Sequence, residues 1–339
     1  MYTIDFNHPI HIYFIGIGGI SMSGLAEIIN KEGFKVSGSD MKASELTKHM
    51  ESLGIQVYIG QKAENIAEDV DLVVYTAAIH KDNPEYQKAV ERKLPMLTRA
   101  EFLGQLMKNY QIPIAVSGTH GKTTTTSMLS HVLLQADTDP TLSIGGILKA
   151  IHGNIRVGGN EYFLTEACEY TNSFLSFYPK IGIILNIDAD HLDFFKDLDD
   201  IRASFKKFTK LLPKDGTLII SSDIDNLSYF TDELNCNIIT FGSQETSDYS
   251  ARDITFDDFG RPTYTLLKKG NEICQITLSV TGIHNVYNSL SAIAAADLLH
   301  IDLDITKKAL LAFSGTDRRF EYKGEIGGVT IIDDYAHHP

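Results

Sequence analysis

The eight residues SGTHGKTT, Ser117–Thr124, follow the apolar run Ile112–Ser117 and lead into the helix-forming run Lys122–Gln135. A strand, a glycine-rich turn and a helix that begins with Lys-Thr form a typical phosphate-binding arrangement. Glycines let backbone N–H groups approach phosphate oxygens, and the helix N-terminus adds about half a positive charge. Lys122 is predicted to reach the β- and γ-phosphates of a nucleotide, and the Thr123 hydroxyl to ligate Mg²⁺.

This loop departs from the general pattern GxxxxGK[ST], whose first glycine would fall on Val116. Gly118 lies three residues before Gly121 instead. A serine- and threonine-rich helix cap without a ligand is the alternative, but the coincidence of strand, two glycines, Lys-Thr and helix favours a phosphate site. The ATP-binding residues predicted on this loop are Gly118, Thr119, His120, Gly121, Lys122, Thr123 and Thr124.

Polar side chains follow two further predicted strands. Glu166 comes directly after Tyr162–Thr165, at the carboxyl end of a strand, where parallel sheets bind ligands. Its carboxylate is the kind of hard oxygen ligand that Mg²⁺ prefers. Ile181–Asn186 leads to His191, whose imidazole is a candidate ligand of a second ion. A lone histidine is more often structural, so that assignment depends on position.

The N-terminal stretch IGIGGISMSG, Ile15–Gly24, resembles the dinucleotide fingerprint GxGxxG, with Ser21 in place of the third glycine. Asp40 follows the predicted strand Lys35–Ser39, where a ribose-binding acid is expected. The pattern predicts NAD, FAD or a UDP-sugar, and a tight turn without a ligand is the alternative. No guanine-reading Asn-Lys-x-Asp occurs in the sequence. Two phosphate sites therefore indicate ATP and a substrate that carries a diphosphate, with candidate residues Gly18, Gly19, Ser21, Met22 and Asp40 for the latter.

The alternation of strands and helices predicts an α/β fold. Residues 1–108 are predicted to form a Rossmann-like parallel sheet domain, and residues 109–315 a central P-loop ATPase domain with a small antiparallel appendage at Ala251–Leu278. Residues 316–339 are expected to begin a largely absent third domain, with Val329–Asp333 as the first strand of another parallel sheet. The remaining predicted strands are His11–Ile15, Gln56–Ile59, Leu72–Tyr75, Thr217–Ser221 and Asn237–Phe241, and the remaining helices are Met22–Lys31, Glu45–Ser52, Pro84–Glu91, Val286–Leu299 and Ile305–Phe313.

Composition limits the function classes. The 339 residues carry a net charge of -14, which argues against a nucleic-acid platform. No apolar run approaches the roughly 18 to 20 residues of a membrane span, and no signal peptide is recognised, so a cytoplasmic protein without membrane insertion is expected. Cys168, Cys236 and Cys274 form no CxxC pair and are expected to be reduced, buried thiols. A monomer or weak homodimer is expected.

Seven segments, in this order and spacing, resemble the Mur ligase family: GIGGISMSG, GTHGKTTTT, TEACEYTNSF, NIDADHLD, HNVYNSLSA, GTDRRFEYKG and DDYAHHP. The resemblance extends from Ile12 to Pro339 and is nearest to the ligases that join L-alanine to the lactyl carboxylate of UDP-N-acetylmuramate. It implies a UDP-substrate domain, an ATPase domain and a C-terminal amino-acid domain. The implied reaction uses ATP and Mg²⁺, passes through an acyl phosphate, and is an early cytoplasmic step of peptidoglycan synthesis, hence of cell-wall biogenesis, cell shape and division.

The resemblance also implies roles for individual residues. Lys122 holds phosphate, Thr123 and Glu166 serve one Mg²⁺, and His191 serves the second, where several sister ligases use a carbamoylated lysine. The HNxxN cluster of His284, Asn285 and Asn288 lies beside adenine; its alternative is a polar helix start. Asp334 is implied near the nucleotide, and Tyr335 and His337 near the amino acid. Arg318 and Arg319 are implied at a hinge, where either forms an interdomain salt bridge or lies near the transferred phosphate, with Arg319 as the catalytic candidate. The departures from the family pattern are Cys168, Tyr170 and Ala336.

Three alternatives stay open. A ligase that recycles muramyl peptides by attaching a preformed peptide would share every motif. A nicotinamide-dependent oxidoreductase would bind NAD(H) in the first domain, and a noncatalytic nucleotide sensor would bind without releasing phosphate. The 339-residue chain alone is expected to bind the UDP-sugar and to turn over poorly.

Overall fold

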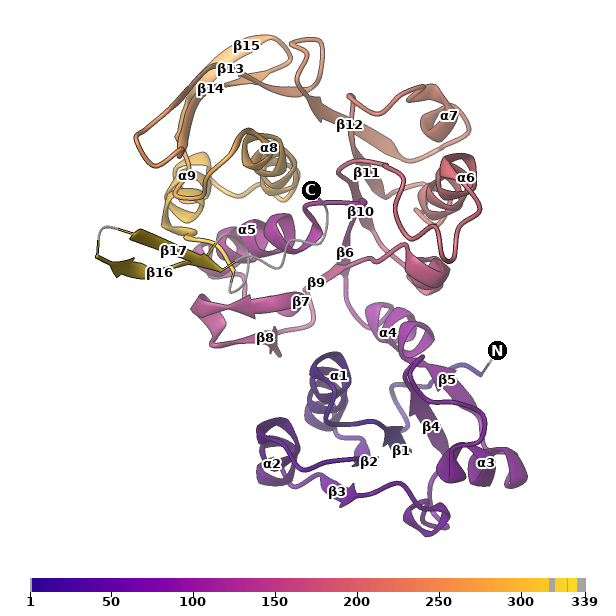
Figure 1. Cartoon of the computed structure of the whole chain (residues 1–339). Coiled ribbons are helices and arrows are strands. Elements are labelled where there is room, and N and C mark those ends of the chain that lie inside the picture. The colour runs from indigo at the N-terminus through magenta and orange to yellow at the C-terminus, as the bar shows by residue number, and fades with distance from the viewer. Residues whose placement is uncertain (1, 317–320, 328, 334–339) are drawn as a thin grey trace. The chain divides into compact units, whose positions relative to one another are not determined.

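The apolar strand HIYFI, which is buried throughout, forms the centre of the first of two compact units, Met1–Asn109 and Tyr110–Pro339 (Figure 1). The computed structural model describes residues 2–316, 321–327 and 329–333. The division lies next to the predicted boundary between residues 108 and 109, and the third domain expected at residues 316–339 stays a prediction.

The first unit is a parallel five-stranded sheet in the order β3-β2-β1-β4-β5. The chain winds from β1 to β2 and β3 on one side, and then crosses to β4 and β5 on the other. The switch between β1 and β4 is where such sheets open a crevice for ligands. The elements are β1 (His11–Ile15), α1 (Ile20–Lys31), β2 (Lys35–Asp40), α2 (Glu45–Ser52), β3 (Gln56–Ile59), η1 (Ala63–Asn65), β4 (Leu72–Tyr75), α3 (Pro84–Glu91), β5 (Met96–Thr98) and α4 (Arg99–Met107).

The second unit is built on a ten-stranded sheet in the order β15-β14-β13-β12-β11-β10-β6-β9-β7-β8. β6 (Ile112–Ser117) lies between β9 and β10 and pairs in parallel with both. The other strands are β7 (Thr141–Leu148), β8 (Gly153–Arg156), β9 (Tyr162–Glu166), β10 (Ile181–Ile184), β11 (Thr217–Ser221), β12 (Asn237–Gly242), β13 (Tyr249–Phe256), β14 (Pro262–Lys268) and β15 (Asn271–Thr277).

Three helices pack together on this sheet: α5 (Lys122–Gln135), α8 (Ile283–Leu298) and α9 (Leu303–Ala312). Their apolar side chains share one buried core with the central strands, in which Leu129, Leu290 and Leu310 are fully covered. The remaining helices of the unit are α6 (Leu198–Thr209), α7 (Ser228–Thr231), η2 (Lys149–Ile151) and η3 (Tyr170–Ser176). The core fixes α5 against α8, and this matters for the phosphate loop that precedes α5.

The predicted α/β class is confirmed, and the Ala251–Leu278 region is antiparallel as expected. These hairpins are joined to the main sheet, because β13 pairs in parallel with β12. β16 (Glu321–Ile326) and β17 (Val329–Asp333) form an antiparallel pair, whereas Val329–Asp333 was expected in a parallel sheet. Strands β5, β7 and β8 and helices α4 and α6 are elements that the sequence pattern did not predict.

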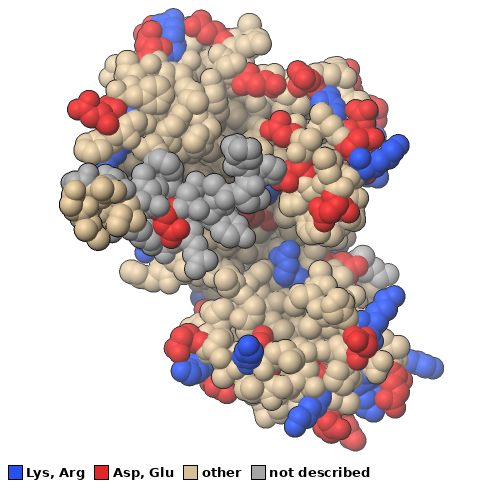
Figure 2. Space-filling view, in the orientation of Figure 1, with Lys and Arg blue, Asp and Glu red and all other residues tan. Residues whose placement is uncertain are grey.

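Acidic and basic side chains are interspersed on the face of the molecule shown in Figure 2. The part of that face that the structure describes carries no continuous basic patch. Within residues 2–316, 321–327 and 329–333, no helix is long and apolar enough to cross a bilayer.

Candidate active site

The phosphate loop joins the end of β6 to the start of α5. Gly121 caps α5 with φ 83°, and among the described residues no side chain caps this helix end. The first N–H groups of a helix have no partner within it, so the amino end of α5 offers donors and positive potential to an anion. The alternative of a serine- or threonine-capped helix without a ligand is therefore not what these residues form.

Gly121 also makes room for a neighbouring helix. A Cβ at this position would lie 2.6 Å from the Asn288 Oδ1 atom. Asn288 is 6% exposed and donates to the Asn285 Oδ1 atom at 2.9 Å, and Asn285 donates to the carbonyl of Thr281 at 2.8 Å. The two asparagines of the HNxxN cluster are thus fixed at the start of α8, with Asn288 packed closely against Gly121 of the phosphate loop.

Asn186, which follows β10, holds the loop from the other side. The Thr119 N–H donates to the Asn186 carbonyl at 3.2 Å, and the His120 N–H donates to Asn186 Oδ1 at 2.7 Å. Asn186 Nδ2 returns a bond to the His120 carbonyl at 3.0 Å, and the Asp188 N–H donates to Thr119 Oγ1 at 2.8 Å. The backbone of the loop is therefore fixed before any nucleotide is present.

Lys122 folds back over the loop. Its Nζ atom donates to the carbonyls of Gly118 at 2.5 Å and Thr119 at 3.0 Å. It also forms an ion pair with Glu169, at 3.0 Å to Oε2 and 3.3 Å to Oε1. The Lys122 side chain is 15% exposed and that of Glu169 is 2% exposed. The ammonium therefore lies inside the loop, where a phosphate chain bound on the amino end of α5 would pass.

Thr123 and Glu166 lie together, as the sequence predicts for a Mg²⁺ site. Thr123 Oγ1 donates to Glu166 Oε2 at 3.1 Å, and Glu166 Oε1 accepts from the Gly145 N–H at 2.5 Å. A Cβ at Gly145 would lie 2.6 Å from Glu166 Oε2, so only glycine allows this approach. The hydroxyl and carboxylate are hard oxygen ligands and fit Mg²⁺. Within the described residues no three His, Cys, Asp or Glu side chains form a metal-binding group, so such an ion would need further oxygens from a nucleotide or water.

His191 lies beside Glu169 rather than within a hydrogen bond of it. Its Nε2 atom is 3.8 Å from Glu169 Oε1 and 3.8 Å from Asp190 Oδ2. The ring lies over Tyr170, with centroids 4.6 Å apart, and Tyr170 donates to Asp193 Oδ2 at 2.8 Å. This hydrogen bond raises the pKa of Tyr170. The His191 imidazole is thus held in place by an aromatic neighbour, and its predicted role as a metal ligand stays a prediction.

A hollow of about 340 Å³ opens next to the loop. His284 and Asn288 line it, whereas Asn285 lies behind Asn288. Burial, with a smaller contribution from Asp223, raises the pKa of Tyr287 at its wall. The remaining lining residues of the hollow are Leu185, Asn186, Ile187, Asp188, Leu198, Arg202, Ser221, Asp223, Ile224, Asp225 and Phe241.

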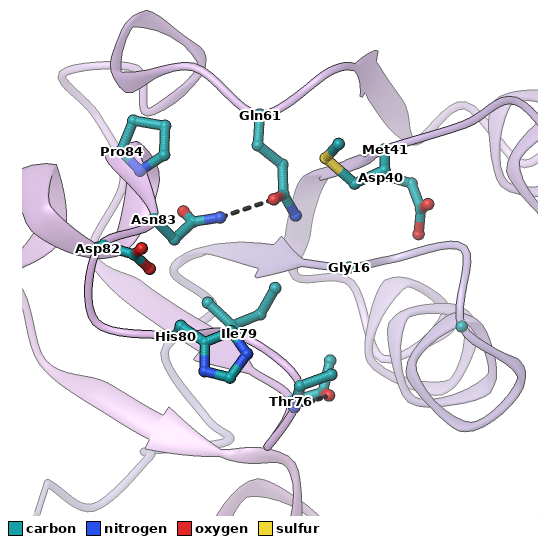
Figure 3. A pocket seen from close by; sticks show the side chains of 12 residues that line it. Gly16, Asp40, Met41, Gln61, Thr76, Ile79, His80, Asp82, Asn83 and Pro84 are labelled. Carbon is teal, nitrogen blue, oxygen red and sulfur yellow. Dashed lines mark hydrogen bonds between the residues drawn. The ribbon is translucent and has the colours of Figure 1, made fainter.

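A second cavity, of about 610 Å³, lies in the first unit at the carboxyl ends of its strands. Gly16 after β1 and Thr76 after β4 mark the switch point, and Gln61 and Asn83 approach each other across the cavity with a hydrogen bond of 2.6 Å (Figure 3). Asp40 lines the wall beside Met41. The remaining lining residues are Gly19, Ala78, Ile79, His80, Asp82 and Pro84.

The candidate residues of the N-terminal fingerprint take different positions. Gly19 lines the cavity, and the Gly18 N–H donates to Asp40 Oδ2 at 2.9 Å, so part of the Asp40 carboxylate supports the glycine turn. Ser21 accepts a hydrogen bond from Arg99 at 3.1 Å. The Met22 side chain is 2% exposed and belongs to the core under α1, which leaves only its backbone for a ligand.

Arg318, Arg319, Asp334, Tyr335 and His337 lie outside the described residues. Sequence reasoning gave no role to Glu169, Asn186 or Gly145, although all three contact predicted site residues. Their importance arises from contacts between segments far apart in the chain. Asn186 ends a predicted strand, and Glu169 and Asn186 both fall inside the motif segments TEACEYTNSF and NIDADHLD, whereas Gly145 had no such signal.

The fold and the site define a class: an α/β protein with a phosphate loop of the P-loop type and a second ligand cavity at the switch point of a Rossmann-like sheet. Two family models match, the Mur ligase middle domain over residues 116–296 and the Mur ligase family catalytic domain over residues 11–111. The chain belongs to the Mur ligase family.

Individual relatives are also similar over the whole chain. The UDP-N-acetylmuramate–L-alanine ligase of Lachnospira eligens is 62% identical over 340 residues, which is 100% of this chain and 74% of the relative. The solved UDP-N-acetylmuramate–alanine ligase of Thermotoga maritima is 32% identical, with a TM-score of 0.82 over 97% of this chain and 74% of that one. The UDP-N-acetylmuramate:L-alanyl-γ-D-glutamyl-meso-diaminopimelate ligase of Neisseria meningitides is 28% identical, with a TM-score of 0.82 over 92% of this chain and 100% of that one.

Proposed function

We infer that this protein joins L-alanine to the lactyl carboxylate of UDP-N-acetylmuramate at the expense of ATP, in peptidoglycan synthesis. The observation that carries this inference is the 62% identity, over the whole chain, to a relative that bears the name of this activity. The phosphate loop supplies the physical basis for the use of ATP. Because ATP and UDP-sugars are cytoplasmic compounds, we expect the reaction to take place in the cytoplasm.

The chemistry requires activation of an acid. A carboxylate does not react with an amine at neutral pH, because oxide is a poor leaving group. Transfer of the γ-phosphate of ATP to the carboxylate gives an acyl phosphate, which the amine attacks with loss of phosphate. The obstacle to the first step is repulsion between the carboxylate and the γ-phosphate, so catalysis depends on positive charge and in-line geometry.

We propose that the nucleotide lies with its phosphates on the amino end of α5 and its nucleoside in the hollow lined by His284 and Asn288. The proposal is supported by the ordered loop backbone, which Asn186 holds through hydrogen bonds to His120 at 2.7 and 3.0 Å. It is also supported by the contact of Gly121 with Asn288, which joins the two parts of such a site. Lys122 would neutralise the phosphate chain near the transferred group.

Thr123 and Glu166 would hold one Mg²⁺, and His191 is proposed for a second. Bound there, the metal would offset phosphate charge during transfer. The residues of this chain act around it: Gly145 fixes the Glu166 carboxylate at 2.5 Å, and Tyr170 holds the His191 ring. The UDP part of the sugar substrate is proposed to occupy the cavity of the first unit, at the switch between β1 and β4.

A muramyl-peptide ligase is the second candidate. The observation that favours it is a TM-score of 0.82 to the Neisseria meningitides enzyme, equal to that of the Thermotoga maritima enzyme. Fold therefore does not separate the two functions. Identities of 62% and 55% to relatives named UDP-N-acetylmuramate–L-alanine ligase favour the single amino acid.

The test is phosphate release by the full gene product across a matrix of UDP-sugars, amino acids and peptides. The proposed function predicts release only with UDP-N-acetylmuramate and L-alanine together. Release with L-alanyl-γ-D-glutamyl-meso-diaminopimelate instead would assign the recycling function. If NAD(H) protects the first unit and UDP-sugars have no effect, neither of the two ligase functions is correct.

A further inference from the structure

Glu169 is a buried carboxylate between two groups of the proposed site, and the mechanism above gives it no role. Its side chain is 2% exposed, and it pairs with Lys122 at 3.0 Å and faces His191 at 3.8 Å. We propose that Glu169 is a positioning residue that holds the Lys122 ammonium in the loop before nucleotide binds, and that releases it to the incoming phosphate. This inference rests on the proposed function, because it requires a phosphate to replace the carboxylate.

The hydrogen-bond count of Lys122 supports the exchange. An ammonium has three N–H donors. Its contacts with the Gly118 carbonyl, the Thr119 carbonyl and the Glu169 carboxylate use all three. A phosphate oxygen can therefore bind to Lys122 only if one of these acceptors withdraws.

The acceptor that can withdraw is Glu169. The two carbonyls belong to a loop backbone that Asn186 fixes through bonds at 2.7 and 3.0 Å. The carboxylate is on a side chain with rotatable bonds, and like charge drives it away from an approaching phosphate. His191 remains beside it at 3.8 Å, so Glu169 keeps a polar neighbour after it releases Lys122.

The ion pair between Lys122 and Glu169 is stronger than an exposed pair because it is buried. Exposed ion pairs contribute little because water screens them, but a pair with side chains 15% and 2% exposed is screened much less. Glu169 thus keeps the Lys122 side chain ordered in the ligand-free state, so that little side-chain entropy is lost when the nucleotide binds. Its carboxylate also competes with the phosphate for the Lys122 ammonium. Removal of its charge should therefore tighten nucleotide binding and have little effect on the transfer step, because Glu169 has released Lys122 once phosphate is bound.

The test is Glu169→Gln, which keeps the shape and one acceptor oxygen but removes the charge. Binding of ADP and ATP without Mg²⁺ is measured by calorimetry, and kcat by phosphate release, both in the full gene product. We expect nucleotide affinity to rise about three- to tenfold. We expect kcat to change by less than about threefold, far less than the roughly 10²–10³ for loss of an electrostatic group that acts in the transition state.

The matched control is Glu233→Gln, which makes the same change of charge at an exposed carboxylate of the same unit, where Glu233 bridges Lys206 and Lys210. It should leave both values unchanged. Unchanged or weaker nucleotide affinity in Glu169→Gln would overturn the inference. Absence of nucleotide binding in the unaltered protein would instead refute the proposed function. If Glu169→Gln does not fold, Glu169→Asn, which also removes the charge, should show the same rise in affinity, and unchanged or weaker affinity in this variant would also overturn the inference.

Discussion

At residue 121 the backbone and a neighbouring side chain both require glycine. The φ angle of 83° lies in the left-handed region, and a Cβ would meet Asn288 Oδ1 at 2.6 Å. The residue therefore turns the chain into α5 and allows α8 to approach the phosphate loop. The phosphate part and the nucleoside part of the proposed site therefore both depend on the absence of a Cβ atom at this one position.

A comparison of Gly121→Ala with Gly270→Ala separates the cost of the backbone angle from the cost of the contact with Asn288. Gly270 has a similar φ of 75°, but the nearest atom to its Cβ would be 4.0 Å away. Gly270→Ala should cost only the backbone strain, roughly 1–2 kcal/mol in the free energy of unfolding. Gly121→Ala should cost more and should also weaken ATP binding, as measured by urea denaturation and calorimetry. Equal losses of stability in the two variants, with ATP affinity kept, would contradict the contact with Asn288.

Lys122→Ala removes the ammonium from the phosphate loop. We expect phosphate release by the full gene product to fall by about 10²–10³ or more, because a preorganised charge is lost from the transition state. The fold should survive, since the side chain is at the rim of the core, and circular dichroism checks this. Lys207→Ala on α6 is the control lysine. Normal phosphate release from Lys122→Ala would refute the assignment of the loop.

At the scale of elements, α6 and the segment after α7 are joined by one carboxylate. Glu233 lies 2.7 Å from both Lys206 Nζ and Lys210 Nζ, and hydrogen bonds to these lysines lower its pKa to about 2 from an ordinary value of 4.5. Because the pKa is lower in the folded state, the ion pairs stabilise the fold above the pKa of the unfolded state. Their contribution is lost as the pH falls from about 4.5 towards 2.

Glu233→Gln should therefore reduce the free energy of unfolding by a small amount at pH 7, small because the carboxylate is exposed. The difference from the unaltered protein should already be smaller at pH 3.5. Urea denaturation at the two pH values measures it. A difference that grows as the pH falls would show that the sign of this linkage is wrong.

The elements that the sequence predicts well are those with strong local signals. The buried run Ile112–Ser117 and the helix Lys122–Gln135 have the observed bounds. β7 was missed because Gly145 and Gly146 interrupt its pattern, and these glycines are present to admit Glu166 and Thr123. The sequence pattern thus missed β7 because of two glycines that the proposed site itself requires.

Part of the predicted constellation is present in the structure, although the roles of its residues stay predictions. Thr123 donates to Glu166, and Lys122 is the neighbour of Thr123 in the chain. Glu169 was missed because its partner Lys122 is 47 positions earlier in the chain, and no local pattern encodes that contact. The sequence thus identifies the residues that belong to motifs, whereas only the folded structure identifies the residues that position them.

At the scale of the whole molecule, each unit has its own sheet, its own cavity and its own proposed ligand. Binding of a ligand to the native state stabilises the structure that contains it, by about 2.7 kcal/mol at one hundred times Kd. The two ligands should therefore act on different parts of the chain.

Hydrogen exchange followed by mass spectrometry measures this. UDP-N-acetylmuramate alone should slow exchange at residues 16–19 and 76–84, which border the first cavity. ATP alone should slow exchange at residues 118–124 and 185–188, around the phosphate loop. NAD(H) serves as the control ligand. Protection of the first cavity by ATP and of the loop by the UDP-sugar would contradict the assignment of ligands to units.

The ion pair between Lys122 and Glu169 has a consequence for inhibitor discovery. In the ligand-free protein the lysine is already satisfied, so a neutral fragment gains nothing from approaching it. Screens against that form should return compounds for the nucleoside hollow and leave the loop empty. A chemist who wants to extend such a hit into the loop should add an anionic phosphate mimic, because only an anion competes with the Glu169 carboxylate for the Lys122 ammonium.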